Sequence, residues 1–258
     1  MDKAILETKF GEANKEYKKY RPTYPDTLFE TIMESVSVPY KKVLDIGAGT
    51  GISTRILAEI FEEVIAIEPD ERMISAGNFG DNVNVINECT ENARINETFN
   101  LITAGNAFYW MEAELVLPQI HGWLKENGIF AAYRYNLPLT DNEEVNKVIC
   151  RESEMNWDHY RHERLRDTGY TYRNINVSSL FQNVKLINID NVVPLVTEAL
   201  VGFFASTSYG SAYIRSNDDP HYLSRLLEKI NEVNCSTIIN VDFSLELVVA
   251  RKSNCSIF

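Results

Sequence analysis

A short apolar run followed by three glycines and a helical pattern constrains this chain more than any other feature. Residues 43–51 read VLDIGAGTG and contain Gly47, Gly49 and Gly51. From Ile52 to Ile60, apolar side chains then recur at helical spacing. Glycines at such a turn let the backbone approach a ligand closely, and the amides at the helix N-terminus are free to bind it. The pattern predicts an α/β fold with a ligand at this turn.

An acidic residue ends the next apolar run. Val64–Ile67 has the pattern of a short buried strand, and Glu68 and Pro69 follow it directly. At the tip of the second strand of a doubly wound sheet, a carboxylate accepts hydrogen bonds from both hydroxyls of a ribose. The glycines and Glu68 together predict a nucleoside-cofactor site.

The glycine spacing narrows the choice of cofactor. A dinucleotide fingerprint needs a third glycine where this chain has Ile52. No Lys-Ser or Lys-Thr follows the glycines, which excludes a Walker phosphate loop. Asp45 lies two residues before the first glycine, and its negative charge suits a positively charged cofactor without phosphate. An alternative role for Asp45 is to cap the amides of the glycine turn.

Residues 43–51 resemble motif I of the class I S-adenosylmethionine-dependent methyltransferases. Residues 17–25 (YKKYRPTYP), 90–110 (TENARINETFNLITAGNAFYW) and, more weakly, 203–213 (FFASTSYGSAY) resemble the type 11 subgroup, which includes trans-aconitate methyltransferase-like enzymes. The resemblance implies a methyltransferase that uses S-adenosylmethionine and releases S-adenosylhomocysteine, without a metal.

The expected fold is a Rossmann-like doubly wound α/β structure. The resemblance implies a seven-stranded sheet that is mostly parallel, with an antiparallel last strand, helices on both faces and a helical lid insert. Apolar runs place strands at 42–46, 64–67, 83–86, 99–104, 129–135, 184–193 and 243–250. We expect one domain over 1–258, divided into an N-terminal helical cap (1–36), a nucleoside-binding half (37–136), a helical lid insert (137–182) and the C-terminal part of the sheet (183–258).

The resemblance also implies which residues bind the cofactor. Met73 would pack on the adenine, Asn106 would border the sulfonium, and Arg21 would pair with the carboxylate of the cofactor. Cys89 departs from the family pattern, because many relatives have an aspartate there and a thiol is a poor acceptor for the adenine amino group. The implied cofactor-binding residues are Tyr20, Arg21, Asp45, Gly47, Gly49, Gly51, Glu68, Pro69, Met73, Cys89, Thr90, Glu91 and Asn106.

An acceptor pocket is expected beyond the fourth strand, at the sheet edge where doubly wound folds bind ligands. Its expected residues are Phe108, Tyr109, Trp110 and Arg134. Methyl transfer needs alignment and exclusion of water, and a general base only for an alcohol or phenol acceptor. No catalytic base is assigned, and Tyr109 is the one candidate for polarising the acceptor. The arginines of residues 151–173 alternate with acidic residues, which favours a solvent-exposed, salt-bridged helix.

The net charge indicates which kind of molecule the protein binds. A formal net charge of −12 argues against a nucleic-acid substrate and favours a small-molecule acceptor. No apolar run is long enough to span a membrane, so we expect a cytoplasmic protein that forms a monomer or a homodimer. The four cysteines lack metal-site spacing. The alternatives left open are an NAD-dependent oxidoreductase and a non-catalytic, methyltransferase-like binding protein.

Overall fold

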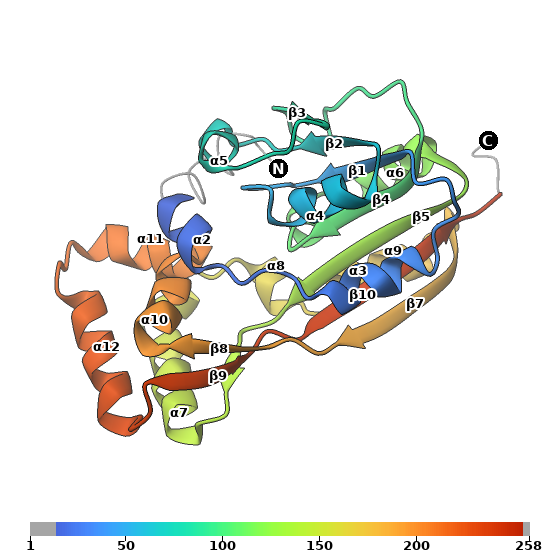
Figure 1. Ribbon diagram of the computed structural model, residues 1–258. Coiled ribbons are helices and arrows are strands. Elements are labelled where there is room, and N and C mark those ends of the chain that lie inside the picture. The colour runs from blue at the N-terminus through green and yellow to red at the C-terminus, as the bar shows by residue number, and fades with distance from the viewer. Residues whose placement is uncertain (1–13, 255–258) are drawn as a thin grey trace.

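A seven-stranded sheet forms the centre of the computed structural model, which describes residues 14–254 (Figure 1). Its strand order is β3-β2-β1-β4-β5-β10-β7. Strands β3 through β5 pair in parallel, whereas β10 runs antiparallel to both β5 and β7. This confirms the expected mostly parallel, doubly wound sheet with an antiparallel last strand. The strands are β1 (Lys42–Ile46), β2 (Glu63–Ile67), β3 (Val83–Ile86), β4 (Phe99–Gly105), β5 (Leu124–Tyr135), β7 (Phe181–Ile189) and β10 (Leu245–Lys252).

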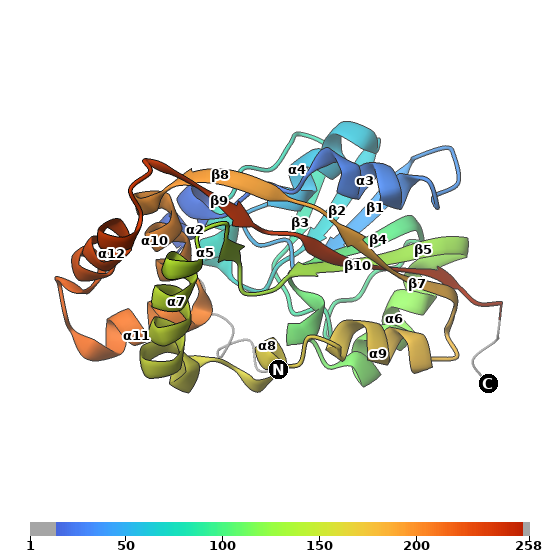
Figure 2. The same ribbon diagram turned by 90° about the horizontal axis from the view of Figure 1, so that it is seen from below.

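Helices cover both faces of this sheet (Figure 2). Helices α3 (Asp26–Met33) and α4 (Ile52–Ile60) lie on one face, and α6 (Ala113–Trp123) and α9 (Tyr170–Val177) lie on the other. Successive strand residues point to opposite faces, so Val43 packs with the first pair of helices and Leu44 with the second. Because both faces are covered, β1 is buried from its second residue onward, which explains its unbroken apolar run.

A second lobe extends from one end of the sheet. Its three-stranded antiparallel sheet has the order β6-β9-β8, and helices pack around a third apolar cluster that contains Trp157 and Phe204. The lobe consists of β6 (Leu139–Thr140), α7 (Glu143–Glu152), the π-helical turn η3 (Ser153–Trp157), η4 (Asp158–Tyr160), β8 (Val192–Val196), α10 (Thr197–Ala205), α11 (Ser208–Asn217), α12 (Tyr222–Val233) and β9 (Ile238–Asp242).

The residues that form the lobe differ from the segments into which the sequence was expected to divide. The apolar run at 184–193 is not one strand, because β7 ends at Ile189 and β8 begins at Val192 in the other sheet. Residues 192–242, expected in the main sheet, therefore build the lobe together with residues 139–160. Residues 126–128 lie inside β5, at an irregularity of its pairing with β4, and Asn127 there has a φ of 60°.

Helix α2 (Asn14–Tyr20) joins the two parts. It packs on α5 (Glu71–Ala76), which follows β2, and on α10 of the lobe. The expected N-terminal cap is thus described only from residue 14, and its first thirteen residues lie outside the described part of the chain. No helix within residues 14–254 is both long enough and apolar enough to cross a membrane.

Candidate cofactor and acceptor site

A cavity opens at the carboxyl ends of β1, β2 and β4. It encloses about 700 Å³, counting its open mouth, which is within the usual size of a small-ligand site. Nine of the thirteen residues expected to bind the cofactor line it. Its lining is Tyr17, Gly47, Gly49, Glu68, Pro69, Asp70, Met73, Cys89, Thr90, Glu91, Gly105, Asn106, Ala107, Trp110 and Met111.

The glycine turn forms the floor of this cavity. Gly47 and Gly49 have φ values of 69° and 58°, in the left-handed region that glycine adopts without steric cost. A Cβ atom on Gly47 would lie 2.4 Å from the Cβ of Ala107, the second residue after β4. The backbone of β1 and the segment after β4 thus approach each other closely because Gly47 has no side chain.

Glu68 is held at the end of β2 by two backbone amides. Its Oε2 accepts a hydrogen bond from the amide of Gly49 at 2.8 Å, and its Oε1 accepts one from the amide of Asp70 at 2.9 Å. Each carboxylate oxygen can accept a second hydrogen bond. The carboxylate is therefore fixed in orientation and retains acceptor capacity in a cavity that it lines.

The protonation of Glu68 gives a testable pH dependence. Burial raises its pKa from 4.5 to about 7, although the amides of Asp70 and Gly49 act in the opposite direction. Ribose hydroxyls donate to the ionised form, so cofactor affinity should rise with pH, by about tenfold between pH 6 and pH 8. Calorimetric titration with S-adenosylhomocysteine across this range measures the rise.

The matched control for this titration is Glu68→Gln, which cannot ionise. Titration of the ligand's own groups remains in the variant, so the difference between the two profiles reports Glu68 alone. A variant profile that rises as steeply as that of the wild type would contradict the assignment. For the ligand-free protein the sign is opposite. The raised pKa means that stability falls as the pH increases from about 4.5 to above 7.

The far wall of the cavity comes from α5 and from the segment after β3. Met73 is 3% exposed, and Cys89 and Thr90 are similarly buried. The terminal methyl of Met73 would lie 3.6 Å from a Cβ on Gly49, so this side chain borders the glycine turn. These residues and Glu68 line the same cavity. The adenine contacts assigned to them stay predictions.

Four expected cofactor residues lie outside the lining of this cavity. The ring of Tyr20 packs against the backbone of Gly202 in α10, and Arg21 borders a second cavity described below. Gly51 precedes α4 with a φ of 80°. The contacts that the resemblance assigns to these residues and to Asp45 stay predictions.

Asp45 is buried behind the glycine turn. Its carboxylate accepts hydrogen bonds from the hydroxyls of Thr54 at 2.7 Å and Thr103 at 2.8 Å. Burial raises its pKa to about 6, and the two hydroxyls lower it. It lines a separate small cavity that also contains Tyr17 and Gly47. Through these two hydrogen bonds Asp45 connects β1 to α4 and to β4, and its carboxylate accepts from the hydroxyls of Thr54 and Thr103 rather than capping the amides of the turn.

A second cavity of about 570 Å³, counting its open mouth, adjoins the first. Tyr17, Asn106 and Trp110 line both cavities and so form their shared wall. Of the four residues expected in an acceptor pocket, Tyr109, Trp110 and Arg134 line this cavity. The rest of its lining is Tyr17, Arg21, Asn106, Tyr135, Asn136, Leu137, Pro138, Arg161, Leu165, Phe203, Thr207, Ser208 and Tyr209.

Asn106 is fixed within the shared wall. It has a φ of 50°, and its side-chain amide donates to the Tyr24 hydroxyl at 3.0 Å and accepts from the Tyr135 amide at 3.2 Å. Asparagine tolerates this backbone region better than most residues. Its position just after β4 agrees with the place expected for a residue beside the reacting centre.

Phe108 differs from its neighbours Tyr109 and Trp110. It is 1% exposed, and its ring lies 5.6 Å from that of Phe130 and 6.1 Å from that of Tyr170. The 3-10 turn η2 (Phe108–Trp110) turns successive side chains in different directions, so Phe108 enters the core beneath α9. The expectation that it lines the acceptor pocket is wrong for this structure.

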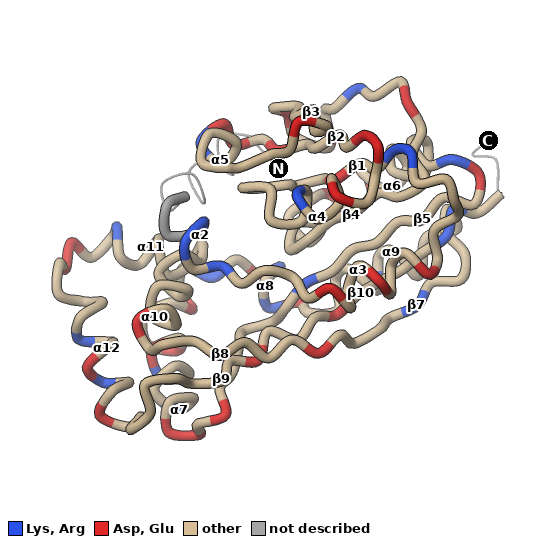
Figure 3. Tube along the Cα trace, in the orientation of Figure 1, with Lys and Arg blue, Asp and Glu red and all other residues tan. Residues whose placement is uncertain are grey.

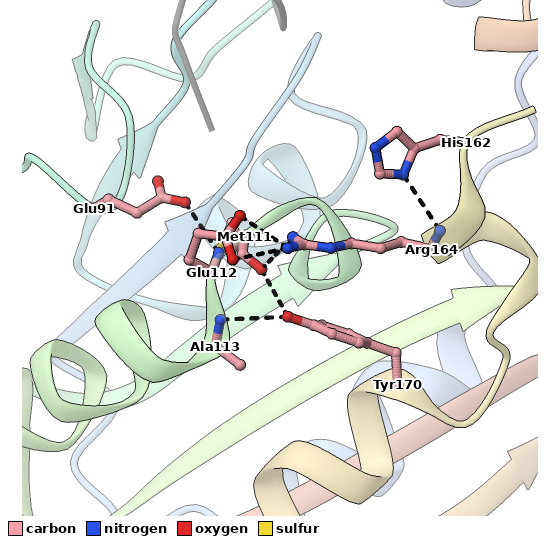
Figure 4. Close-up of polar contacts among 7 residues, drawn as sticks. All are labelled: Glu91, Met111, Glu112, Ala113, His162, Arg164 and Tyr170. Atoms are coloured by element: carbon pink, nitrogen blue, oxygen red, sulfur yellow. Dashed lines mark hydrogen bonds and ion pairs between the residues drawn. The ribbon is translucent and has the colours of Figure 1, made fainter.

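Hydrogen bonds and an ion pair hold the helical insert to the segment that precedes α6 (Figure 4). From α8 (Glu163–Arg166), Arg164 donates to both carboxylate oxygens of Glu112 at 2.8 Å and to the carbonyl of Met111 at 2.9 Å. The hydroxyl of Tyr170 donates to the same carbonyl at 3.0 Å. This arrangement agrees in part with the expected salt-bridged insert, but Arg161 instead borders the second cavity.

Sequence reasoning did not single out Tyr17, Asp70, Met111 or Tyr209, all of which line a cavity. Tyr17 opens the segment YKKYRPTYP, and Tyr209 lies in FFASTSYGSAY. The resemblance of these two segments to the type 11 subgroup is the signal in the sequence that could have identified Tyr17 and Tyr209. Within the described residues no group of three or more His, Cys, Asp or Glu side chains is placed to hold a metal ion.

Comparison with known proteins agrees with this geometry. Residues 44–132 match the family model described as a methyltransferase domain. A methyltransferase-family protein of Dictyostelium discoideum is 27% identical over 254 residues, which covers 96% of each chain. A Saccharomyces cerevisiae protein named for S-adenosylmethionine-dependent methyl transfer is 30% identical over 132 residues, covering 47% of this chain and 45% of that protein.

Solved structures share the fold. A methyltransferase-family protein from Anaeromyxobacter dehalogenans superposes with a TM-score of 0.75 at 20% identity, over 90% of this chain and 98% of that one. A phosphoethanolamine N-methyltransferase from Haemonchus contortus, solved with S-adenosylhomocysteine, gives a TM-score of 0.54 at 10% identity, over 95% of this chain and 58% of that one.

Proposed function

Because the family-model match and the relatives support a class I S-adenosylmethionine-dependent methyltransferase, we propose that this chain transfers the methyl group of S-adenosylmethionine to oxygen or nitrogen of a small molecule. The observation that carries the proposal is the shared wall. Tyr17, Asn106 and Trp110 line both the cavity that contains the nucleoside-binding elements and a second cavity of similar size. Two reactants held on either side of Asn106 would meet there.

The first cavity fits the cofactor. Gly47 and Gly49 line it without side chains, the fixed Glu68 carboxylate can accept from ribose hydroxyls, and Met73 lines the same cavity. When bound, S-adenosylmethionine supplies a methyl group already activated on a sulfonium. The protein then needs to align the two reactants and exclude water. Half-buried or buried aromatic residues at the shared wall, Tyr17 and Trp110, serve that exclusion.

Calorimetric titration with S-adenosylmethionine, S-adenosylhomocysteine and NAD tests the proposal. We expect micromolar binding of the first two ligands, and a loss of tenfold or more, about 1.4 kcal/mol, in Glu68→Ala. Glu59→Ala is the matched control, because Glu59 lies in α4 and lines neither cavity.

The outcomes separate the alternatives. Folded protein that binds neither sulfur ligand would refute the methyltransferase proposal, and binding of NAD instead would favour the oxidoreductase. Tight binding of S-adenosylhomocysteine without transfer to any acceptor class would favour the non-catalytic binding protein.

The proposed partner is a small molecule rather than a nucleic acid. The net charge is −12, and acidic positions occur on both lobes (Figure 3). Such a charge opposes binding to a phosphate backbone. We propose a monomer or a homodimer that works in the cytoplasm.

A further inference from the structure

Arg21 connects three parts of the fold at one point. It directly follows α2, and its Nε donates to the Ser206 hydroxyl at 3.1 Å while its Nη2 donates to the Ser206 carbonyl at 3.3 Å. Its Nη1 donates to the Tyr135 hydroxyl at 2.5 Å. Tyr135 ends β5, and Ser206 directly follows α10. One side chain therefore holds α2 to the main sheet and to the second lobe.

The Arg21 guanidinium finds its partners within the protein. Ser206 is buried and caps the C-terminus of α10, where the last carbonyls lack partners in the helix and carry partial negative charge. The guanidinium carbon also lies 4.8 Å from the ring centre of Phe203 and 4.6 Å from that of Tyr17. Arg21 lines the second cavity but not the first. These contacts give the guanidinium a role in the packing of α2 that needs no ligand.

Tyr17 is the cavity residue that Arg21 contacts on its own helix. It lies four residues earlier, at helical spacing, and its carbonyl accepts from the Arg21 amide at 3.1 Å. Tyr17 lines both large cavities and the small cavity beside Asp45. Burial raises the pKa of its phenol, so the ring stays neutral beside the guanidinium at neutral pH. The position of this one ring thus affects the shape of both large cavities.

Helix α2 depends on tertiary contacts for its position. It has seven residues, and isolated helices shorter than about 12 residues are marginal in water. A Cβ atom on Gly202 in α10 would lie 2.6 Å from the ring of Tyr20, so α2 approaches α10 as closely as a glycine allows. Arg21 bonds to Ser206, one turn further along α10, and completes the attachment.

We propose that Arg21 is a positioning residue, which holds α2 against α10 and β5 and thereby keeps Tyr17 in the lining of both cavities. This inference rests on the proposed function. Arg21 then acts on the cofactor through Tyr17, whereas the family resemblance implies a direct ion pair with the carboxylate of the cofactor. The two roles predict different results for the same substitution.

A double-mutant cycle measures whether Arg21 acts through Tyr17. We expect Arg21→Gln and Tyr17→Ala each to weaken S-adenosylhomocysteine binding about tenfold in calorimetry. The double variant should lose no more than about threefold beyond Tyr17→Ala, because Arg21 has no ring left to position. Independent losses that multiply to about a hundredfold would overturn the inference. Arg21→Lys keeps a cation at the end of α10 and should recover part of the loss.

A second ligand separates positioning from direct pairing. Decarboxylated S-adenosylhomocysteine lacks only the carboxylate with which Arg21 would pair. If Arg21 positions Tyr17, then Arg21→Gln weakens the binding of both ligands by the same factor. A loss confined to the ligand that carries the carboxylate would show a direct ion pair and overturn the inference.

Hydrogen exchange of the ligand-free protein tests the attachment of α2 independently of binding. We expect Arg21→Gln to speed exchange in residues 14–21 about tenfold or more and to leave β1 and β4 unchanged. Gly202→Ala should displace α2 from the side of α10, speed the same exchange and weaken S-adenosylhomocysteine. Unchanged exchange in Arg21→Gln, or faster exchange in Gly202→Ala without loss of affinity, would overturn the inference.

The control variant is Arg251→Gln. Arg251 also connects separate segments, since it donates to the carbonyls of Asn127 at 2.8 Å and Ser35 at 3.2 Å, but it lines neither cavity. We expect wild-type affinity and wild-type exchange in residues 14–21. Equal losses in Arg251→Gln and Arg21→Gln would show a general loss of stability and overturn the inference. Failure of the wild-type protein to bind S-adenosylmethionine or S-adenosylhomocysteine would instead refute the methyltransferase proposal.

Discussion

Gly47→Ala is expected to lower cofactor affinity by at least about a hundredfold and to destabilise the fold by about 2–4 kcal/mol. Two costs combine. A side chain at a φ of 69° is strained, and its Cβ would lie 2.4 Å from the Cβ of Ala107. The backbone fixes the position of each Cβ, so neither atom can rotate away. The glycine turn must therefore move away from the segment after β4. Urea unfolding measures the stability change, and calorimetry with S-adenosylhomocysteine measures the affinity.

Gly122→Ala provides the control for this prediction. A Cβ on Gly122, near the end of α6, would have no neighbour within 4 Å, and alanine is the better helix former. We expect that variant to be more stable by about 0.5–1 kcal/mol, with unchanged affinity. Wild-type affinity in Gly47→Ala would show that the cofactor does not bind at the glycine turn.

Trp157→Ala is expected to destabilise the second lobe by about 3–5 kcal/mol. The indole is 1% exposed, stacks on Phe204 at 4.9 Å between ring centres, and donates to the Tyr222 hydroxyl at 2.7 Å. Its removal would leave a cavity in an apolar cluster separate from the two clusters of the main sheet. Hydrogen exchange should therefore speed up first in residues 139–160 and 192–242.

The main sheet should keep its protection from exchange in Trp157→Ala, and S-adenosylhomocysteine should still bind. Trp157→Phe keeps an aromatic ring and removes only the donor to Tyr222, so we expect a smaller cost of about 1 kcal/mol. If Trp157→Ala instead accelerates exchange equally in both lobes, the lobe is not a separate unit of stability.

Local patterns made the nucleoside-binding half predictable. The order of strand, glycine turn and helix over Val43–Ile60 is encoded within eighteen residues, and Glu68 follows its strand directly. Apolar runs locate the buried strands because both faces of the sheet are covered. The antiparallel placement of β10 came from the resemblance, since periodicity carries no information on strand direction.

The second lobe was not predictable in the same way. Its β6 pairs with β9 across about a hundred residues of sequence, and neither strand has an extended apolar run.

The positions of the aromatic residues after β4 were not predictable either. Phe108 and Tyr109 are adjacent in sequence, yet Phe108 enters the core and Tyr109 lines a cavity. Only the turn geometry of η2 and the packing of α9 decide between these positions.

Helix α2 has a thermodynamic consequence for the two ligands. Tyr17 borders both cavities, and the helix packs on α5 beside one of them and on α10 beside the other. Free energy that either ligand contributes to holding α2 in place is available to the other ligand as well. Linkage then requires reciprocity. The factor by which bound cofactor tightens the acceptor equals the factor by which bound acceptor tightens the cofactor.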